Sequence, residues 1–119
     1  TADTGPQCTG SDRDAASIQN AEANAGRALS RARFHVRDLR DVSIDEPSHI
    51  VANPPYGERL DSAAVFSDLS SAIERWRDHH VTLLLPEDAP LDGQRRRYAA
   101  ARALFNGPLR CRLVTWQAG

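Results

Sequence analysis

The feature that most constrains the fold is a nearly continuous apolar run, Val81-Thr82-Leu83-Leu84-Leu85. A strand with one solvated face alternates apolar and polar residues, whereas a continuous run is typical of a strand buried on both faces of a parallel sheet. Parallel strands must be joined by long crossover connections, which are usually helices. The run therefore predicts an α/β fold with a mostly parallel sheet, if strands and helices alternate elsewhere in the chain.

They do alternate. Further strands are predicted at Gln7–Asp12, Arg33–Arg37, His49–Ala52 and Leu109–Trp116. One helix is predicted after Asp14, a good N-cap, and a second after Asp61 or Ser62. Apolar residues at helical spacing mark their buried faces: Ile18, Ala21, Ala25 and Leu29 in the first, and Val65, Leu69, Ala72, Ile73 and Trp76 in the second. This order favours the α/β class.

The C-terminal region is predicted to end in an antiparallel hairpin. Asn106-Gly107 is a hairpin signal between two apolar stretches. The stretch from Gln94 to Ala103 is expected to begin as a helix and to become a strand near its end. It starts with the dense basic cluster Arg95-Arg96-Arg97, which fits either a solvated helix face, the preferred interpretation, or a contact with an RNA backbone.

Composition limits the class of protein. A chain of 119 residues with 40% hydrophobic and 26% charged residues is expected to be one globular domain. No apolar run approaches the roughly 20 residues of a membrane span, and no secretory leader is visible. Cys8 and Cys111 are far apart and are expected to be free thiols. The cysteines and four histidines show no metal-binding spacing, so we expect no metal site. With no membrane span or secretory leader visible, we expect a cytoplasmic protein.

The tetrapeptide Asn53-Pro54-Pro55-Tyr56 directly follows the predicted strand at His49–Ala52. It suits the methylation of an exocyclic amino group, whose nitrogen is a poor nucleophile because its lone pair is delocalised. The Asn53 side-chain oxygen and the Pro54 carbonyl can accept the two N–H groups, and two prolines stiffen that carbonyl. Tyr56 offers a flat face for an unstacked base. The alternative is a proline turn with a packed tyrosine.

Three polar residues follow predicted strands: Asp12, Asp38 and Asn53. Ligands of open α/β sheets bind beyond the carboxyl ends of the strands, so these positions favour a single site. Each aspartate has an alternative role as a helix cap or turn former, and Asp14 could replace Asp12 in either role.

The motif continues as Gly57-Glu58-Arg59-Leu60, and in this context the chain resembles the THUMP-associated class I methyltransferases, above all the bacterial 23S ribosomal RNA guanine-N2 methyltransferases. Two further segments agree in order and spacing: Gly10–Asp14 with the helix residues Ala21–Ala25, and Asn106–Cys111. The resemblance covers roughly residues 8 to 116. Asn-Pro-Pro-Tyr alone is shared with DNA adenine and protein glutamine methyltransferases, but the continuation is much more specific.

The resemblance implies a Rossmann-like class I sheet with helices on both faces and a C-terminal antiparallel hairpin. It implies that S-adenosyl-L-methionine is the cofactor, with Asp12 accepting from its ribose hydroxyls, Asp38 from its adenine amino group, and Asn53 beside it. Asn53 and Pro54 would orient the target amine and Tyr56 would stack on the flipped base. The remaining loop residues, expected to contact substrate, are Pro55, Gly57, Glu58 and Arg59.

The family's first cofactor motif, a strand followed by a glycine-rich turn, has no counterpart upstream of Gly10. Residues 1–119 are therefore expected to be a partial methyltransferase domain without this motif and without the THUMP domain, and to be inactive in isolation. The family's strand order places the absent strand between the strands that end at Asp12 and Asn53. Unpaired sheet edges would then favour self-association.

The implied function is methylation of N2 of a guanosine in RNA, most plausibly 23S ribosomal RNA. Alternatives are a methyltransferase for a tRNA guanosine, for adenine N6 or for a glutamine amide, or a non-catalytic remnant that binds RNA or a partner chain. The net charge of -1 does not by itself favour RNA.

Overall fold

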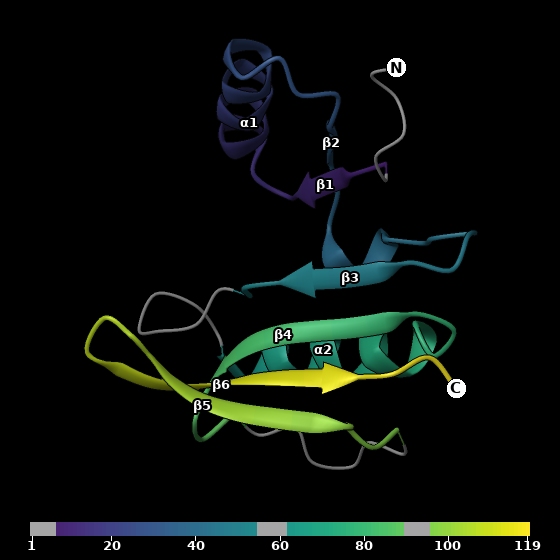
Figure 1. The fold of residues 1–119 in the computed structure, drawn as a ribbon, viewed down its shortest axis with the longest axis vertical. Coiled ribbons are helices and arrows are strands. Elements are labelled where there is room, and N and C mark those ends of the chain that lie inside the picture. The colour runs from purple at the N-terminus through teal and green to yellow at the C-terminus, as the bar shows by residue number, and fades with distance from the viewer. Residues whose placement is uncertain (1–6, 55–61, 90–95) are drawn as a thin grey trace. The chain divides into compact units, whose positions relative to one another are not determined.

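The computed structural model describes residues 7–54, 62–89 and 96–119 (Figure 1). The chain divides into two compact units, Thr1–Val42 and Ser43–Gly119. The first unit contains β1 (Thr9–Asp12), α1 (Ala15–Arg27), β2 (Arg33–Val36) and the short 3-10 helix η1 (Leu39–Asp41). The second contains β3 (His49–Ala52), α2 (Ser62–Arg75), β4 (His80–Pro86), β5 (Ala100–Asn106) and β6 (Leu109–Trp116). Each unit is described by itself.

In the first unit, β1 and β2 form a parallel two-stranded sheet with α1 as the crossover. Gly10 on β1 lies opposite Phe34 on β2, and a Cβ atom at Gly10 would lie 2.8 Å from the Phe34 ring. The close approach of the aromatic ring therefore requires glycine at this position of the strand. The only buried side chain among the described residues of this unit is Ile18.

The end of α1 differs from the sequence prediction. Leu29 was expected on the buried face of the helix, and this is wrong: α1 ends at Arg27, and Leu29 is 90% exposed with a φ of 55°. The amides of Leu29 and Ser30 donate to the carbonyls of Gly26 (3.2 Å) and Ala25 (2.8 Å). This is the Schellman arrangement, which ends a helix with a left-handed residue that is usually glycine. With leucine at this position, the sequence pattern does not mark the helix end.

In the second unit, four strands lie in the order β3-β4-β6-β5. β3 and β4 are parallel, whereas β4–β6 and β5–β6 are antiparallel, so the predicted C-terminal hairpin is confirmed and the sheet is mixed. Its two-residue loop is Gly107-Pro108, with a φ of 61° at Gly107. A positive φ at the first central residue only is the type II′ pattern, which matches the twist of the flanking strands.

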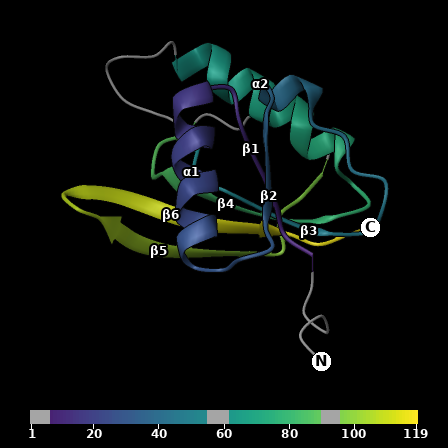
Figure 2. The ribbon, with the colours of Figure 1, turned by 90° about the horizontal axis from the view of Figure 1, so that it is seen from above.

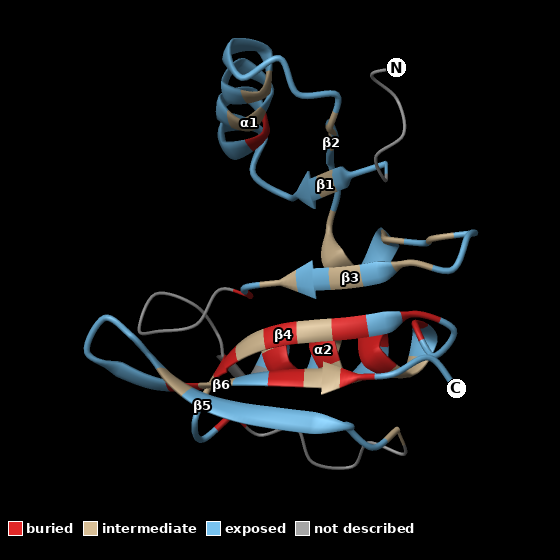
Figure 3. Cartoon of the chain, in the orientation of Figure 1, coloured by how far each residue is buried: buried red, intermediate tan, exposed pale blue. Residues whose placement is uncertain are grey.

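The core of the second unit lies between α2 and one face of this sheet. Figures 1 and 2 show α2 lying across the sheet, and Figure 3 shows the buried residues on α2, β4 and β6. On β4 the burial alternates: Val81, Leu83 and Leu85 are fully buried, whereas Thr82 and Leu84 are half-buried. Within the described residues, the face opposite α2 therefore remains partly open.

The predicted buried face of α2 is largely confirmed, because Leu69, Ala72, Ile73 and Trp76 are all buried. Val65 is half-buried, and the buried Phe66 was not predicted. The predicted helix from Gln94 is wrong over residues 96–99, which contain no helix. Instead, the Ala99 amide donates to the Thr115 carbonyl at 2.7 Å, so pairing with β6 begins one residue before β5.

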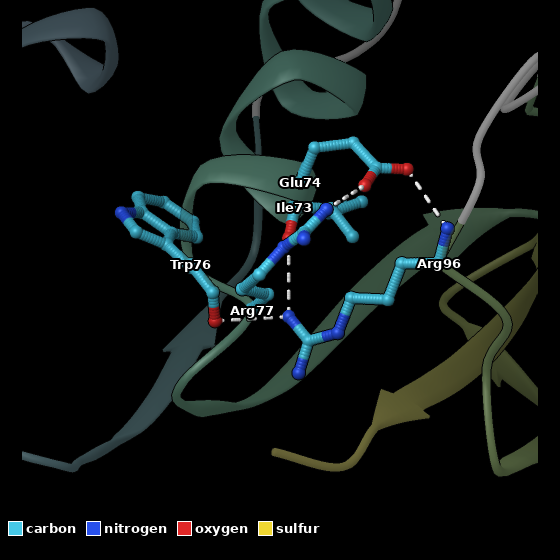
Figure 4. Close-up of polar contacts among 5 residues, drawn as sticks. All are labelled: Ile73, Glu74, Trp76, Arg77 and Arg96. Carbon is cyan, nitrogen blue, oxygen red and sulfur yellow. Dashed lines mark hydrogen bonds and ion pairs between the residues drawn. The ribbon is translucent and has the colours of Figure 1, made fainter. Parts of the chain in front are cut away.

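Hydrogen bonds from the Arg96 side chain join this segment to the C-terminal end of α2 (Figure 4). Its guanidinium donates to the carbonyls of Ile73 (3.1 Å) and Trp76 (3.0 Å), and also to those of His79 and Gln117. The final carbonyls of a helix have no partners within the helix and carry partial negative charge, so a cation is favoured there. Partial burial lowers the pKa of Arg96, and neighbouring Glu74 opposes this shift. The sequence interpretation of Arg96 as part of a solvated helix face is therefore wrong.

Candidate cofactor and substrate site

Asp12 and Asp38 lie at the same edge of the first unit's sheet. Asp12 ends β1, and its register partner Val36 ends β2, two residues before Asp38. The amide of Arg37 donates to the Asp12 carbonyl at 2.9 Å, which extends the pairing past β2. Because the two strands are parallel, both carboxylates follow carboxyl ends at one edge, as the sequence predicted for residues that share a ligand.

Asp12 and Asp14 have different hydrogen-bonding environments. The Asp14 carboxylate caps α1 by accepting from the Ala16 amide (3.2 Å) and the Ser17 hydroxyl (2.8 Å). The hydrogen bond from Ser17, followed by that from Ala16, lowers the pKa of Asp14 below its usual value. Among the described residues, Asp12 accepts only the Asp14 amide, at 2.9 Å, through Oδ1. A carboxylate has about four acceptor positions, so Asp12 keeps most of its capacity for a ligand.

Asp38 is the N-cap of η1, so the turn-forming role considered from the sequence is present. Its carboxylate accepts from the Arg40 amide at 2.9 Å, from Arg40 Nε at 3.0 Å and from Arg40 Nη2 at 3.3 Å. The side-chain hydrogen bond from Arg40 lowers the pKa of Asp38, so this carboxylate is ionised at neutral pH. One acceptor position remains, enough for a single donor such as an amino group.

Asn53 and Pro54 follow β3 in the second unit, at the edge where β4 also has its carboxyl end. Asn53 is exposed, and its side chain makes no hydrogen bond to any other described residue, whereas Pro54 is buried. An exposed amide beside a buried proline suits the predicted pair of acceptors. The other predicted residues of this loop, Pro55, Tyr56, Gly57, Glu58 and Arg59, lie outside the described residues.

Polar contacts that the sequence did not reveal hold β3 in place. His49 Nε2 lies 2.8 Å from Thr82 Oγ1, which lies 3.2 Å from Thr115 Oγ1, so one polar chain crosses three strands. Before β3, the Ser48 amide donates to Nδ1 of the buried His79 at 3.0 Å. This contact connects the segment before β3 to the end of the α2–β4 connection. A histidine in the sequence does not indicate which distant backbone amide it will contact.

The two units thus contribute different chemistry. The first presents two carboxylates at strand ends, which suit hydroxyl and amino donors, and the second presents an exposed amide beside a buried proline. Within residues 7–54, 62–89 and 96–119, no group of three or more potential metal ligands is present. The described helices include none long and apolar enough to cross a membrane. Of the two cysteines, Cys8 is exposed and Cys111 is buried.

The fold is that of class I methyltransferases. The chain is similar to SMU.472, a methyltransferase solved in complex with SAH, with a TM-score of 0.85 and 22% identity over 99% of this chain and 33% of that one. It is also similar to the tRNA (uracil-54, C5)-methyltransferase of Pyrococcus abyssi, solved with S-adenosyl-L-homocysteine. That similarity has a TM-score of 0.69 and 19% identity, and covers 94% of this chain and 29% of that one.

Within this class, the chain belongs to the family described as UPF0020, the RMKL-like methyltransferase domain, whose match covers residues 2–112. It is 32% identical over 111 residues to the ribosomal RNA large subunit methyltransferase K/L of Alteromonas mediterranea. That alignment covers 87% of this chain and 16% of the relative, so the chain spans about a sixth of its length. The resemblance inferred from the motif and its flanking segments is confirmed.

Proposed function

We propose that this chain forms part of an S-adenosyl-L-methionine-dependent enzyme that methylates N2 of a guanosine in ribosomal RNA. The observation that carries the proposal is the position of the exposed Asn53 beside the buried Pro54, at the carboxyl end of β3. Membership of the RMKL-like family and the similarity to methyltransferase K/L support it. The two similar structures solved with S-adenosylhomocysteine support the choice of cofactor.

On the cofactor side, we assign the ribose hydroxyls to Asp12 and the adenine amino group to Asp38. Asp12 has the larger unused acceptor capacity, so it is the better partner for two hydroxyl donors. Asp38 is already engaged by Arg40, and its remaining capacity matches one amino donor. Asn53, next to the transferred group, would contact both cofactor and substrate.

On the substrate side, the Asn53 side-chain oxygen and the Pro54 carbonyl accept the two N–H groups of the target amine and direct its lone pair. Tyr56 stacks on the flipped base, while Pro55, Gly57, Glu58 and Arg59 surround it. The bound cofactor supplies an electrophilic methyl group. Asp12, Asp38 and Asn53 would hold this cofactor, whose methyl group would be transferred to the amine nitrogen, with sulfur keeping the electron pair and the surplus proton leaving the nitrogen. Positioning the two reactants supplies most of the catalysis.

The test is methyl transfer from radiolabelled S-adenosyl-L-methionine to ribosomal RNA by the complete gene product that contains these residues. Asn53→Ala should lower the rate about a hundredfold or more, by analogy with loss of a preorganised polar contact. Cofactor affinity, measured by calorimetry, should stay nearly unchanged. Asn20→Ala, at an exposed position of α1, makes the same substitution away from the site and should leave the rate unaltered.

Digestion of the product to nucleosides and mass spectrometry should give N2-methylguanosine. Parallel reactions with tRNA, DNA and protein identify the other amino-group substrates, and methylation of one of these instead would contradict the assignment to ribosomal RNA. Tyr56→Phe should be milder than Tyr56→Ala, because stacking needs the ring. An Asn53→Ala rate within a few-fold of the parent rate would contradict the role of Asn53.

A further inference from the structure

Charge is strongly segregated along this chain. Residues 93–119 contain six arginines and no acidic residue, a charge of +6, whereas residues 1–92 contain nine arginines and all sixteen acidic residues, a charge of -7. The net charge of -1 conceals this asymmetry. A segment with an excess of arginine and no acidic residue of its own favours a polyanionic partner.

The arginines of this segment are not equivalent. Arg96 is engaged by four carbonyls, whereas Arg102 and Arg110 are exposed on the hairpin. No ion pair joins Arg102 or Arg110 to a carboxylate within the part of the chain that the structure describes. The guanidinium groups of Arg102 and Arg110 are therefore available to a partner. They lie on opposite faces of the hairpin, because Arg110 shares a face with its register partner Phe105, and Phe105 and Arg102 point to opposite faces of β5.

The tip of the hairpin combines charge with an aromatic ring. The register of β4 with β6 ends at Pro86 opposite Cys111, and one further bond follows, from the Glu87 amide to the Arg110 carbonyl at 3.0 Å. The side chains of Phe105 and Arg110 therefore lie just past the end of β4. Phe105 is 67% exposed, and the Arg110 guanidinium lies 5.9 Å from its ring centroid. An exposed aromatic ring beside a guanidinium matches the stacking and phosphate contacts of single-stranded nucleic acid.

This tip lies at the edge of the sheet that carries Asn53. β3 is parallel to β4, and the tip extends beyond the carboxyl end of β4, where Pro86 pairs with Cys111 (Figure 1). Three strand spacings separate β3 from β5, about 14 Å across the sheet. A short length of RNA with one nucleotide at Asn53 can therefore also reach the hairpin tip.

We propose that the β5–β6 hairpin tip is a contact surface for single-stranded RNA flanking the target nucleotide. Phe105 stacks on a base and Arg110 binds the adjacent phosphate. The inference rests on the proposed RNA substrate, but it concerns binding rather than methyl transfer. An acidic peptide would satisfy the positive charge, but it would not use the exposed ring.

The experiment measures the anisotropy of a fluorescein-labelled, mixed-sequence single-stranded RNA titrated with the full chain. Phe105→Ala should weaken binding about tenfold, since stacking on a base is worth at least one such factor. Phe105→Tyr keeps the ring and should remain within about twofold of the parent. Arg110→Gln should weaken binding and lower the salt slope by roughly 0.7, the value for one contact with a single strand. Arg102→Gln, the same change on the other face, should alter neither.

Equal losses of RNA affinity for Arg102→Gln and Arg110→Gln would show that binding depends only on total charge and would overturn the proposal. Competition by a ten-glutamate peptide at the same concentration as RNA, with no effect of Phe105→Ala, would assign the surface to an acidic protein partner and would also overturn it. The proposed function is tested separately. RNA binding that depends on Phe105 without methyl transfer refutes only that function, whereas methyl transfer to RNA together with RNA binding unchanged by Phe105→Ala refutes only this inference.

Discussion

The two units of the chain differ sharply in how much they bury. In the first unit Ile18 is the only buried apolar residue that the structure describes, whereas twelve such residues are buried in the second. Both units contain a parallel strand pair and a helix, so the difference does not arise from element type. It arises because β4 and β6 supply alternating apolar residues to α2, whereas the residues of β1 and β2 remain mostly exposed.

This contrast assigns different physical roles to the two groups of candidate residues, each within its own unit. The amide of Asn53 follows a strand anchored to a packed sheet, whereas Asp12 and Asp38 follow strands with little core beneath them. An isolated two-stranded sheet is marginally stable at best in water. Among the described strands, β1 pairs only with β2, and β3 only with β4. We propose that these open edges allow the self-association predicted from the sequence.

The largest expected effect of this contrast is on amide hydrogen exchange of the full chain. Amides of β4 and β6 should exchange only through global unfolding, whereas those of β1, β2 and α1 should exchange through local opening, orders of magnitude faster. Mass spectrometry of peptides from labelled protein measures both sets together. Equal protection of the two units would contradict the contrast and would show that the first unit is stabilised by contacts beyond those described.

A smaller effect is expected from Arg96 in the second unit. Arg96→Gln should lower the free energy of unfolding by about 2–3 kcal/mol, because charge-assisted hydrogen bonds to several helix-end carbonyls are lost. Arg96→Lys should be intermediate, since an ammonium cannot reach four carbonyls at once. Urea unfolding followed by circular dichroism measures the change. Arg97→Gln, at the exposed neighbouring position, is the matched control and should change stability by less than about 0.5 kcal/mol.

Much of the second unit could be predicted because its signals are local and periodic. The spacing of Leu69, Ile73 and Trp76 marked the buried face of α2, and Asn106-Gly107 marked the hairpin. The carboxyl-end positions of Asp12 and Asp38 likewise followed from the order of strands. The contacts made by Arg96 could not be predicted, because its four carbonyl partners lie 17 to 23 positions away in sequence. Sequence periodicity carries no information on such long-range polar contacts.

The smallest effect tests the first unit at Leu29, whose left-handed conformation costs roughly 1–2 kcal/mol in a residue with a side chain. Leu29→Gly removes this cost but gives the unfolded chain more freedom, worth about 0.5–1 kcal/mol in the opposite direction. A net gain of about 0.5 kcal/mol should slow exchange of the Ser30 amide, which the helix end protects, about twofold. Leu29→Ala keeps the left-handed cost and should show no such slowing. Because the first unit is expected to open locally, the global unfolding midpoint should stay unchanged. A rise in that midpoint for Leu29→Gly would instead show that the two units unfold together.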